Sequence, residues 1–135
     1  MRPCWFVSLV IAFTLCSVSL VAKKFPLTAA TTVPAARGDV EIGKDRNKNT
    51  EIKMKVKHLA QPENLTPPKS SYVVWLQEKG SEAENQGQLR LDKKLEGNFR
   101  TVTPRKSFDI FITAEQDVAV KAPSGAEVMR ATIQQ

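Results

Sequence analysis

The chain has 135 residues, with 20 Lys and Arg against 14 Asp and Glu for a net charge of +6, and 41% of its residues are apolar. That length allows one small domain and excludes two packed catalytic domains. Both cysteines, Cys4 and Cys16, lie within the first 22 residues, so the rest of the chain has no disulfide, thiolate nucleophile or cysteine metal site. The single histidine, His58, excludes a histidine-rich zinc centre, and we expect no cofactor.

The first 22 residues have the pattern of an export signal. A short basic start at residues 1–3 precedes an uncharged, mostly apolar run over residues 4–22. Ser17-Val18-Ser19 and the weaker pattern Leu20-Val21-Ala22 offer sites for cleavage of a secretory signal peptide after Ser19 or Ala22. An uncleaved signal anchor is the alternative, because a helix over this run would be about 28 Å long, close to the ~30 Å hydrocarbon core of a bilayer. Either interpretation predicts that the rest of the chain is extracytoplasmic, in the periplasm or secreted.

Residues 23–37 are predicted to be a linker. The stretch from Phe25 to Ala36 reads FPLTAATTVPAA and carries no charge. Proline and small residues favour extended backbone and offer little surface to bury. The folded domain is therefore expected to span residues 38–135.

From Gly38 onward the dominant period is two, which is typical of half-buried strands. The expected strands are 39–42, 51–57, 71–77, 88–92, 97–102, 108–113, 117–121 and 127–133. Residues 78–86 are expected to form a charged loop, and strands 88–92 and 97–102 to form a hairpin. About seven or eight short strands with turns between them predict an all-β, antiparallel sandwich of two sheets.

Two of these strands are apolar on both faces, which indicates a central position in a sheet. They are predicted to supply the core, with Trp75 and Phe111 at its centre. The expected core residues are Tyr72, Val74, Trp75, Phe108, Ile110 and Phe111.

A stripe of three lysines is the candidate contact for an anionic surface. Lys53, Lys55 and Lys57 alternate with apolar residues and so share one face of a strand. Such a stripe could attract phosphate-bearing polymers or lipids. A solvated face that resists edge pairing explains it equally well. No aromatic residue interleaves with the lysines, so base stacking lacks a platform and nucleic acid is not expected as a partner.

Three short motifs have ordinary explanations beside the functional ones. The oxygen-bearing residues of 45–51 resemble the start of a calcium loop, but the remaining ligands are missing, so a hairpin turn is expected. Residues 37–39 spell Arg-Gly-Asp, an adhesion tripeptide, in which the glycine is also explained as a turn. Asn64-Leu65-Thr66 fits a glycosylation acceptor, which matters only in a eukaryotic host.

No catalytic constellation is apparent. His58 has no cysteine partner, and no G-x-S-x-G elbow is present to activate a serine. Glu115 and Asp117 are interpreted as an ordinary pair at a strand end, and Ser124 as a turn residue. The sequence therefore predicts a protein that is not an enzyme.

Four short sequence motifs together resemble those of one protein family. They are His58-Leu59 before a proline loop, Tyr72 to Trp75 as YVVW, Phe108 to Glu115 as FDIFITAE, and Pro123-Ser124-Gly125. In this order they resemble the C-terminal extracytoplasmic domain of anti-sigma-K-type factors, over roughly residues 38–133. The resemblance implies an immunoglobulin-like β-sandwich outside the membrane, with a threonine-glutamate strand end and a Pro-Ser/Thr-Gly turn. It does not extend to sigma-factor binding, because only residues 1–3 precede the apolar run, where that family has a cytoplasmic helical region.

The expected function is that of a non-enzymatic interaction module of the bacterial envelope, with an envelope protein as its partner. Loops 61–69 and 79–87 are the expected contacts, since loops carry recognition on rigid β scaffolds. The alternative is a basic surface that binds an anionic envelope polymer or lipid through Lys53, Lys55 and Lys57.

Overall fold

The computed structural model describes residues 23–135, and the predicted export signal at residues 1–22 lies outside the described residues. The described chain is built from strands and one short 3-10 helix. The strands are β1 (Lys23–Pro26), β2 (Thr28–Ala29), β3 (Arg37–Lys44), β4 (Thr50–Lys57), β5 (Ser71–Gln77), β6 (Glu84–Leu89), β7 (Gly97–Thr103), β8 (Phe108–Glu115) and β9 (Glu127–Ile133). The 3-10 helix η1 (Pro62–Asn64) lies in the proline loop.

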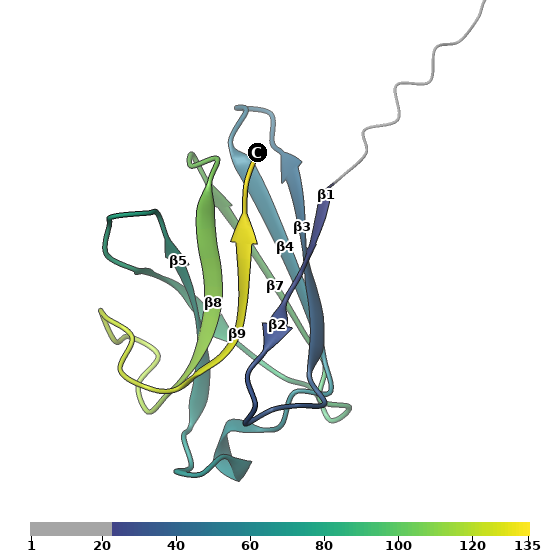
Figure 1. Ribbon diagram of the computed structural model, residues 1–135, viewed down its shortest axis with the longest axis vertical. Helices are drawn as coiled ribbons and strands as arrows, with labels where there is room; N and C mark the ends of the chain where they lie inside the picture. The colour runs from purple at the N-terminus through teal and green to yellow at the C-terminus, as the bar shows by residue number, and fades with distance from the viewer. Residues whose placement is uncertain (1–22) are drawn as a thin grey trace, which may run out of the picture.

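The strands form two antiparallel sheets that pack face to face (Figure 1). One sheet has the order β1-β3-β4-β7 and the other the order β2-β9-β8-β5-β6. The prediction of an all-β, two-sheet antiparallel architecture is confirmed. The start of β1 and the C-terminus lie at one end of the molecule, and η1 lies at the other (Figure 1).

The β3-β4 hairpin shows how the alternation of apolar and polar residues sets the pairing register of two strands. Val40 pairs with Met54 and Ile42 with Ile52, so the apolar side chains of both strands point inward. The turn between them is held by Asp45, whose Oδ1 accepts the amides of Asn47 and Asn49 at 2.8 Å each. The predicted hairpin turn is thus built as an Asx turn.

The segment predicted to be a linker instead forms part of the sandwich. β1 pairs with β3, and β2 pairs with β9, so this segment crosses from one sheet to the other. Leu27, Val33 and Ala36 are buried in the core. The sequence interpretation missed this because the apolar side chains that pack in this segment are few and irregularly spaced, with three of them buried and Phe25 and Ala29 partly buried.

Truncating Leu27 therefore gives a clear test of this segment. Leu27 is 7% exposed, and replacing a buried leucine with alanine typically costs about 2–4 kcal/mol. We expect Leu27→Ala to lower the free energy of unfolding by that amount in chemical denaturation. Exposed Thr31 in the same segment is the control, and Thr31→Ala should change stability by less than about 0.5 kcal/mol. Equal, negligible effects of the two changes would restore the linker interpretation.

The predicted hairpin of 88–92 with 97–102 is wrong. β6 begins earlier than expected, at Glu84, and pairs with β5, whereas β7 pairs with β4 in the other sheet. The two segments share one isolated backbone bridge, between Leu91 and Gly97, and a side-chain hydrogen bond from Thr101 to Gln86 at 3.0 Å, but they belong to different sheets. The polar composition of β6 hid it among loop residues. The predicted strand at 117–121 is also absent from the structure, which has a turn there in which Asp117 accepts the amide of Ala119 at 2.9 Å.

All six predicted core residues are buried, but they belong to two clusters. Tyr72, Val74, Phe108 and Ile110 lie between the sheets. Trp75 and Phe111 lie with Val73 on the opposite face of the five-stranded sheet. Successive side chains on a strand point to opposite faces, so Trp75 cannot join Val74 in the same layer. The placement of these two aromatics at the centre of the main core is therefore corrected.

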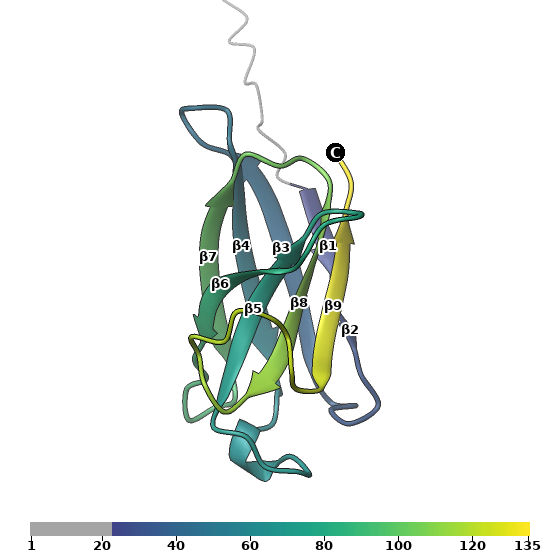
Figure 2. The ribbon, with the colours of Figure 1, turned by 90° about the vertical axis from the view of Figure 1, so that its left-hand side faces the viewer.

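The outer cluster is covered by the segment between β8 and β9. Val120 from this segment and Ala83 from the β5-β6 loop pack against it. Figure 2 shows the yellow-green segment lying across β5 and β8. The molecule therefore has a third, small layer over its five-stranded sheet.

Candidate interaction surfaces

Basic charge is concentrated on the four-stranded half of the sandwich. Segments 23–26, 37–57 and 91–103 contain twelve Lys and Arg against six Asp and Glu, whereas the rest of the described chain has seven against eight. Within this half, Lys53, Lys55 and Lys57 are all exposed on the outer face of β4, as the alternation predicted. Charged residues on the neighbouring strands β3 and β7 determine which of these lysines lie beside an acidic group.

Cross-strand neighbours divide this face into two sides. Toward β3, Lys53 pairs with Glu41 and Lys55 with Asp39, which places opposite charges beside these two lysines, whereas Lys57 pairs with Arg37. Toward β7, Lys53 pairs with Arg100. Glu51 approaches both cations, with its Oε1 2.8 Å from Arg100 Nη2 and 4.0 Å from Lys53 Nζ. The face is therefore most basic along β4 and toward β7.

A buried carboxylate joins two segments that are separated in sequence. Glu115 at the end of β8 is 1% exposed. It accepts the Thr113 hydroxyl at 2.8 Å, the Gly125 amide at 2.9 Å and the Ser124 amide at 3.1 Å, and also the Ser124 hydroxyl. Trp75 Nε1 donates to Thr113 Oγ1 at 2.8 Å, which extends the network into the outer cluster. We call this network the Glu115 latch, because it ties residues 124–125 to the end of β8.

Close packing at Gly125 completes the latch. A Cβ built on Gly125 would lie 1.6 Å from the carbonyl oxygen of Ala114, so a side chain cannot be accommodated at this position. The amide of Ala114 also donates to the carbonyl of Ala126 at 3.0 Å. The sequence interpretation gave Glu115 and Ser124 separate, local roles, whereas the structure brings them into direct contact.

The latch determines the ionisation of Glu115. Burial raises the pKa of its carboxyl, but hydrogen bonds from Ser124, Thr113 and the Gly125 amide outweigh burial, so the pKa lies below its ordinary value. Every one of these donors favours the charged form. Glu115 is therefore an ionised acceptor near neutral pH and a weak proton acceptor for chemistry.

The lowered pKa predicts a stability that depends on pH. Because the folded state holds the carboxyl ionised more tightly than the unfolded chain does, Glu115 stabilises the fold above its ordinary pKa. This contribution is lost as the pH falls through the lowered value. Glu115→Gln should be less stable than the wild type by about 2–3 kcal/mol at neutral pH, and the difference should shrink as the pH falls below the ordinary glutamate pKa of about 4.3. Chemical denaturation across this range measures it, and a difference that stays constant would contradict the assignment.

The outer cluster is a closed arrangement and not an open platform. Trp75, Phe111 and Arg130 occupy matching positions across β5, β8 and β9. The Trp75 and Phe111 ring centroids are 6.5 Å apart, and the Arg130 guanidinium carbon lies 4.3 Å from the Phe111 centroid. Arg130 is also held by Asp109 at 2.7 Å and Glu127 at 2.6 Å. Arg130 and the covering segment thus seal the aromatic pair.

Three loop segments enclose a hollow of about 410 Å³ at the end of the sandwich that carries η1. We call it the loop-end hollow. Its walls come from Thr32, from residues 60–69 and from residues 124–126. The lining includes apolar Leu65, Pro67 and Val128 beside polar Asn64. Ser124 and Gly125 belong both to this wall and to the latch, so the Glu115 latch fixes one side of the hollow.

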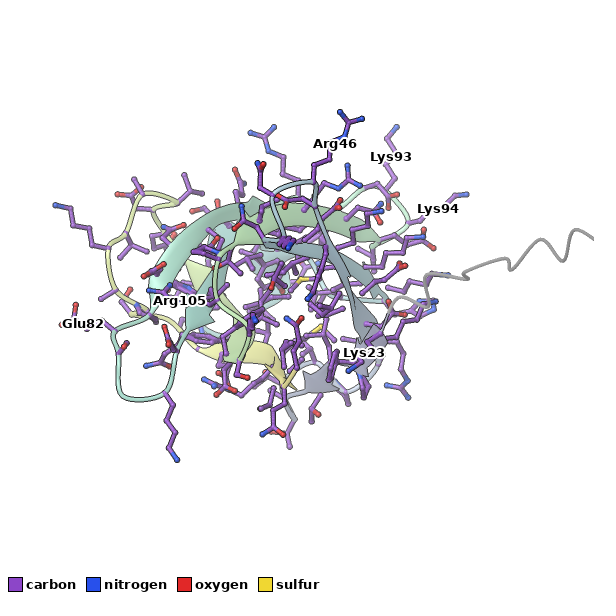
Figure 3. All side chains as sticks on the ribbon, turned by 90° about the horizontal axis from the view of Figure 1, so that it is seen from above. Lys23, Arg46, Glu82, Lys93, Lys94 and Arg105 are labelled. Atoms are coloured by element: carbon purple, nitrogen blue, oxygen red, sulfur yellow. The ribbon has the colours of Figure 1, made fainter. Side chains whose placement is uncertain are left out.

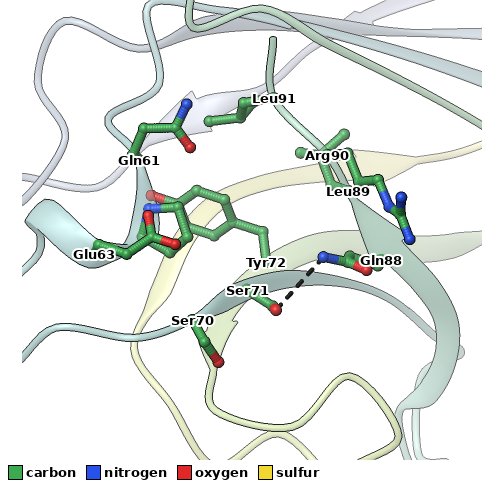
Figure 4. A pocket seen from close by; sticks show the side chains of 10 residues that line it. Gln61, Glu63, Ser70, Ser71, Tyr72, Gln88, Leu89, Arg90 and Leu91 are labelled. Carbon is green, nitrogen blue, oxygen red and sulfur yellow. Dashed lines mark hydrogen bonds between the residues drawn. The ribbon is translucent and has the colours of Figure 1, made fainter. Parts of the chain in front are cut away.

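A smaller hollow of about 290 Å³ lies between the 61–63 turn and β6 (Figure 4). Tyr72 lies at its base and donates its hydroxyl to the Ala60 carbonyl at 2.6 Å. Burial and the nearby charge of Glu63 raise the pKa of Tyr72 to about 12, so the phenol stays neutral. The two predicted contact loops are not one surface, because 61–69 precedes β5 and 79–83 follows it, at opposite ends of the strand.

The remaining motifs take structural positions. Arg37-Gly38-Asp39 begins β3, where all three residues pair with β4 and Asp39 also pairs with Pro26 of β1, so the tripeptide does not form a loop tip. Asn64 ends η1 and is exposed. His58 follows β4 with a left-handed backbone and is exposed. Arg105, which the sequence interpretation did not single out, joins Glu78 at 2.6 Å and Glu84 at 2.7 Å.

The comparisons with known proteins identify no family. The chain matches no protein-family model, and none of the curated proteins matches it. Among residues 23–135, no helix is long and apolar enough to cross a membrane. Over the same residues, no group of three or more His, Cys, Asp or Glu side chains is placed to hold a metal ion.

Proposed function

We propose that this chain is a non-enzymatic, extracytoplasmic interaction module of the bacterial envelope that binds a protein partner through its loop-end hollow. In this proposal the sandwich is immunoglobulin-like and is related to the outer domain of anti-sigma-K-type factors. Residues 1–22 direct export and are either cleaved or retained as an anchor.

The Glu115 latch is the observation that carries the proposal. This network joins two of the sequence motifs on which the resemblance rests. They are the threonine-glutamate strand end and the Pro-Ser-Gly turn. Their joint occurrence in the sequence thereby gains a physical reason, because each motif supplies the other's hydrogen-bond partners. The same network shapes a wall of the loop-end hollow, which links the resemblance to a surface.

The non-enzymatic part of the proposal is supported by how reactive side chains are used. Ser124 donates its hydroxyl to Glu115, whose lowered pKa makes it a poor general base. Thr113 is likewise engaged, receiving a hydrogen bond from Trp75 and donating one to Glu115. These groups stabilise the fold of the loop end.

The loop end is a suitable docking surface because three separate segments meet there on a rigid scaffold. Recognition is commonly carried by such loops. The hollow combines apolar walls with exposed polar groups at its rim, such as Asn64, which is the composition of a specific contact. A hollow of this volume has room for more than one side chain of a partner.

A substitution at the rim tests the proposal. Asn64→Arg adds a long charged side chain beside the hollow and should abolish capture of a specific envelope protein by the full chain. Capture is performed in about 0.5 M salt, where contacts between exposed charges are largely screened. The matched control is Ser81→Arg, which adds the same group to an exposed position at the other end of β5.

The results for the two variants distinguish docking at the loop-end hollow from docking elsewhere on the molecule. We expect Ser81→Arg to capture the same protein as the wild type, identified by mass spectrometry, and Asn64→Arg to lose it. Capture that survives Asn64→Arg, or that is lost equally in both variants, would contradict docking at the loop-end hollow. Absence of any specific protein with the wild type would contradict the proposed function itself.

A further inference from the structure

We infer that the four-stranded sheet carries a second binding surface, a basic track along β4 that takes a linear polyanion. This surface lies on the four-stranded sheet, whereas the Glu115 latch lies on the five-stranded sheet. It does not depend on the proposed protein partner. It is defined by Lys53, Lys55 and Lys57, with Arg100 beside them on β7.

The track runs along the second half of β4, and further basic residues lie in turns near the two ends of this strand. Lys53, Lys55 and Lys57 follow one another at about 7 Å, because residues on one face of a strand are separated by two rises of ~3.3 Å. The 45–49 turn with Arg46 lies before β4, and the 92–96 turn lies near its far end, where Leu59 donates to the carbonyl of Leu95. Figure 3 looks along the sandwich and shows Arg46, Lys93 and Lys94 projecting away from Glu82.

The placement of Arg100 opposite Lys53 supports a binding role. Like charges directly opposite each other on neighbouring strands destabilise a sheet. Arg100 remains 63% exposed and Lys53 49% exposed, even though Glu51 lies near both. Glu51 already lies between these two cations, and because both remain exposed, a second anion can approach them from solvent.

The form of the track favours a linear polymer over a lipid surface. Amphipathic segments that bind stably at a membrane surface add buried apolar or aromatic side chains to their basic ones. In the described chain, the outer face of this sheet offers Val102 at its β7 edge, 47% exposed, and no aromatic side chain beside the lysines. Asp39 and Glu41 border Lys55 and Lys53 on the β3 side, so the basic charge there is confined to β4 and widens only at Lys57, which lies opposite Arg37.

The test uses inorganic polyphosphate as the probe and the full chain as the protein. Affinity should fall steeply with salt, because binding releases the counterions of the polyanion. Lys53→Gln/Lys55→Gln/Lys57→Gln should lower the affinity about tenfold at low salt and reduce the slope of log affinity against log salt by about three. The matched control, Lys79→Gln/Lys106→Gln/Lys121→Gln, removes three exposed lysines outside the four-stranded sheet and should change both quantities little.

Each outcome decides the proposal. Equal losses in the two triple variants would show that only net charge matters and would overturn the track. Binding to vesicles that contain anionic phospholipid but not to polyphosphate would replace the polymer with a lipid surface and overturn it as well. No binding to polyphosphate at low salt would also overturn it. Since protein capture in high salt is measured separately, failure here leaves the loop-end proposal standing.

Discussion

Replacing Gly125 with alanine should destabilise the protein by about 3–5 kcal/mol. The added Cβ would lie 1.6 Å from the Ala114 carbonyl oxygen, which belongs to a buried strand end that cannot move freely. The 124–126 segment must then withdraw and lose its hydrogen bonds to Glu115 and to the Ala114 amide. A buried carboxylate would be left with fewer donors, which is costly. Chemical denaturation of the full chain measures the loss.

Gly43 provides the matched control. It lies in β3, and a Cβ built there meets nothing within 4 Å. Gly43→Ala should therefore change the free energy of unfolding by less than about 0.5 kcal/mol. Similar effects of the two substitutions would show that residues 124–126 are not packed against β8, and the Glu115 latch would have to be abandoned.

Trp75→Ala is expected to cost about 3–5 kcal/mol. The side chain is fully buried, stacks on Phe111 and donates to Thr113. Because Trp75 lies in the outer cluster and not between the sheets, the damage should concentrate in the covering segment around Val120. Hydrogen exchange should show residues 116–125 losing protection more than β3 and β4 do.

Trp75→Phe separates the two contributions of this residue. Phenylalanine keeps most of the apolar contact but removes the indole donor to Thr113. We expect a loss of about 1–2 kcal/mol, smaller than that of Trp75→Ala. If Trp75→Ala instead raised exchange uniformly in both sheets while leaving residues 116–125 unaffected, the division into two clusters would be wrong.

The strands with regular alternation could be predicted from the sequence because burial on one face leaves a direct trace in the residue pattern. β4, with Ile52, Met54 and Val56 facing inward, is the clearest case. β6 left no such trace, because it is a polar edge strand whose Leu89 alone is buried. The sequence also did not indicate that β6 and β7 belong to different sheets. A tight turn near Asp92 can connect two strands of one hairpin or two strands of different sheets, so the turn residues do not distinguish the two cases.

For the candidate sites too, the sequence could predict only what the residue pattern of a single strand determines. The exposure of Lys53, Lys55 and Lys57 followed from alternation within one strand, but their acidic neighbours on β3 depend on cross-strand register. Glu115 and Ser124 are nine residues apart, with a covering segment between them, so no local pattern could indicate their contact. Arg105 likewise reaches Glu78, twenty-seven residues earlier, through tertiary structure alone.

Site-specific photo-crosslinking in living cells tests the proposed docking surface most directly. A photoreactive amino acid replaces Asn64 at the loop-end hollow in one chain and Ser81 at the other end of β5 in a second. We predict a discrete crosslinked adduct with one envelope protein from position 64 and none from position 81. An adduct from position 81 alone, or no adduct from position 64, would contradict the proposal that the loop-end hollow binds a protein partner.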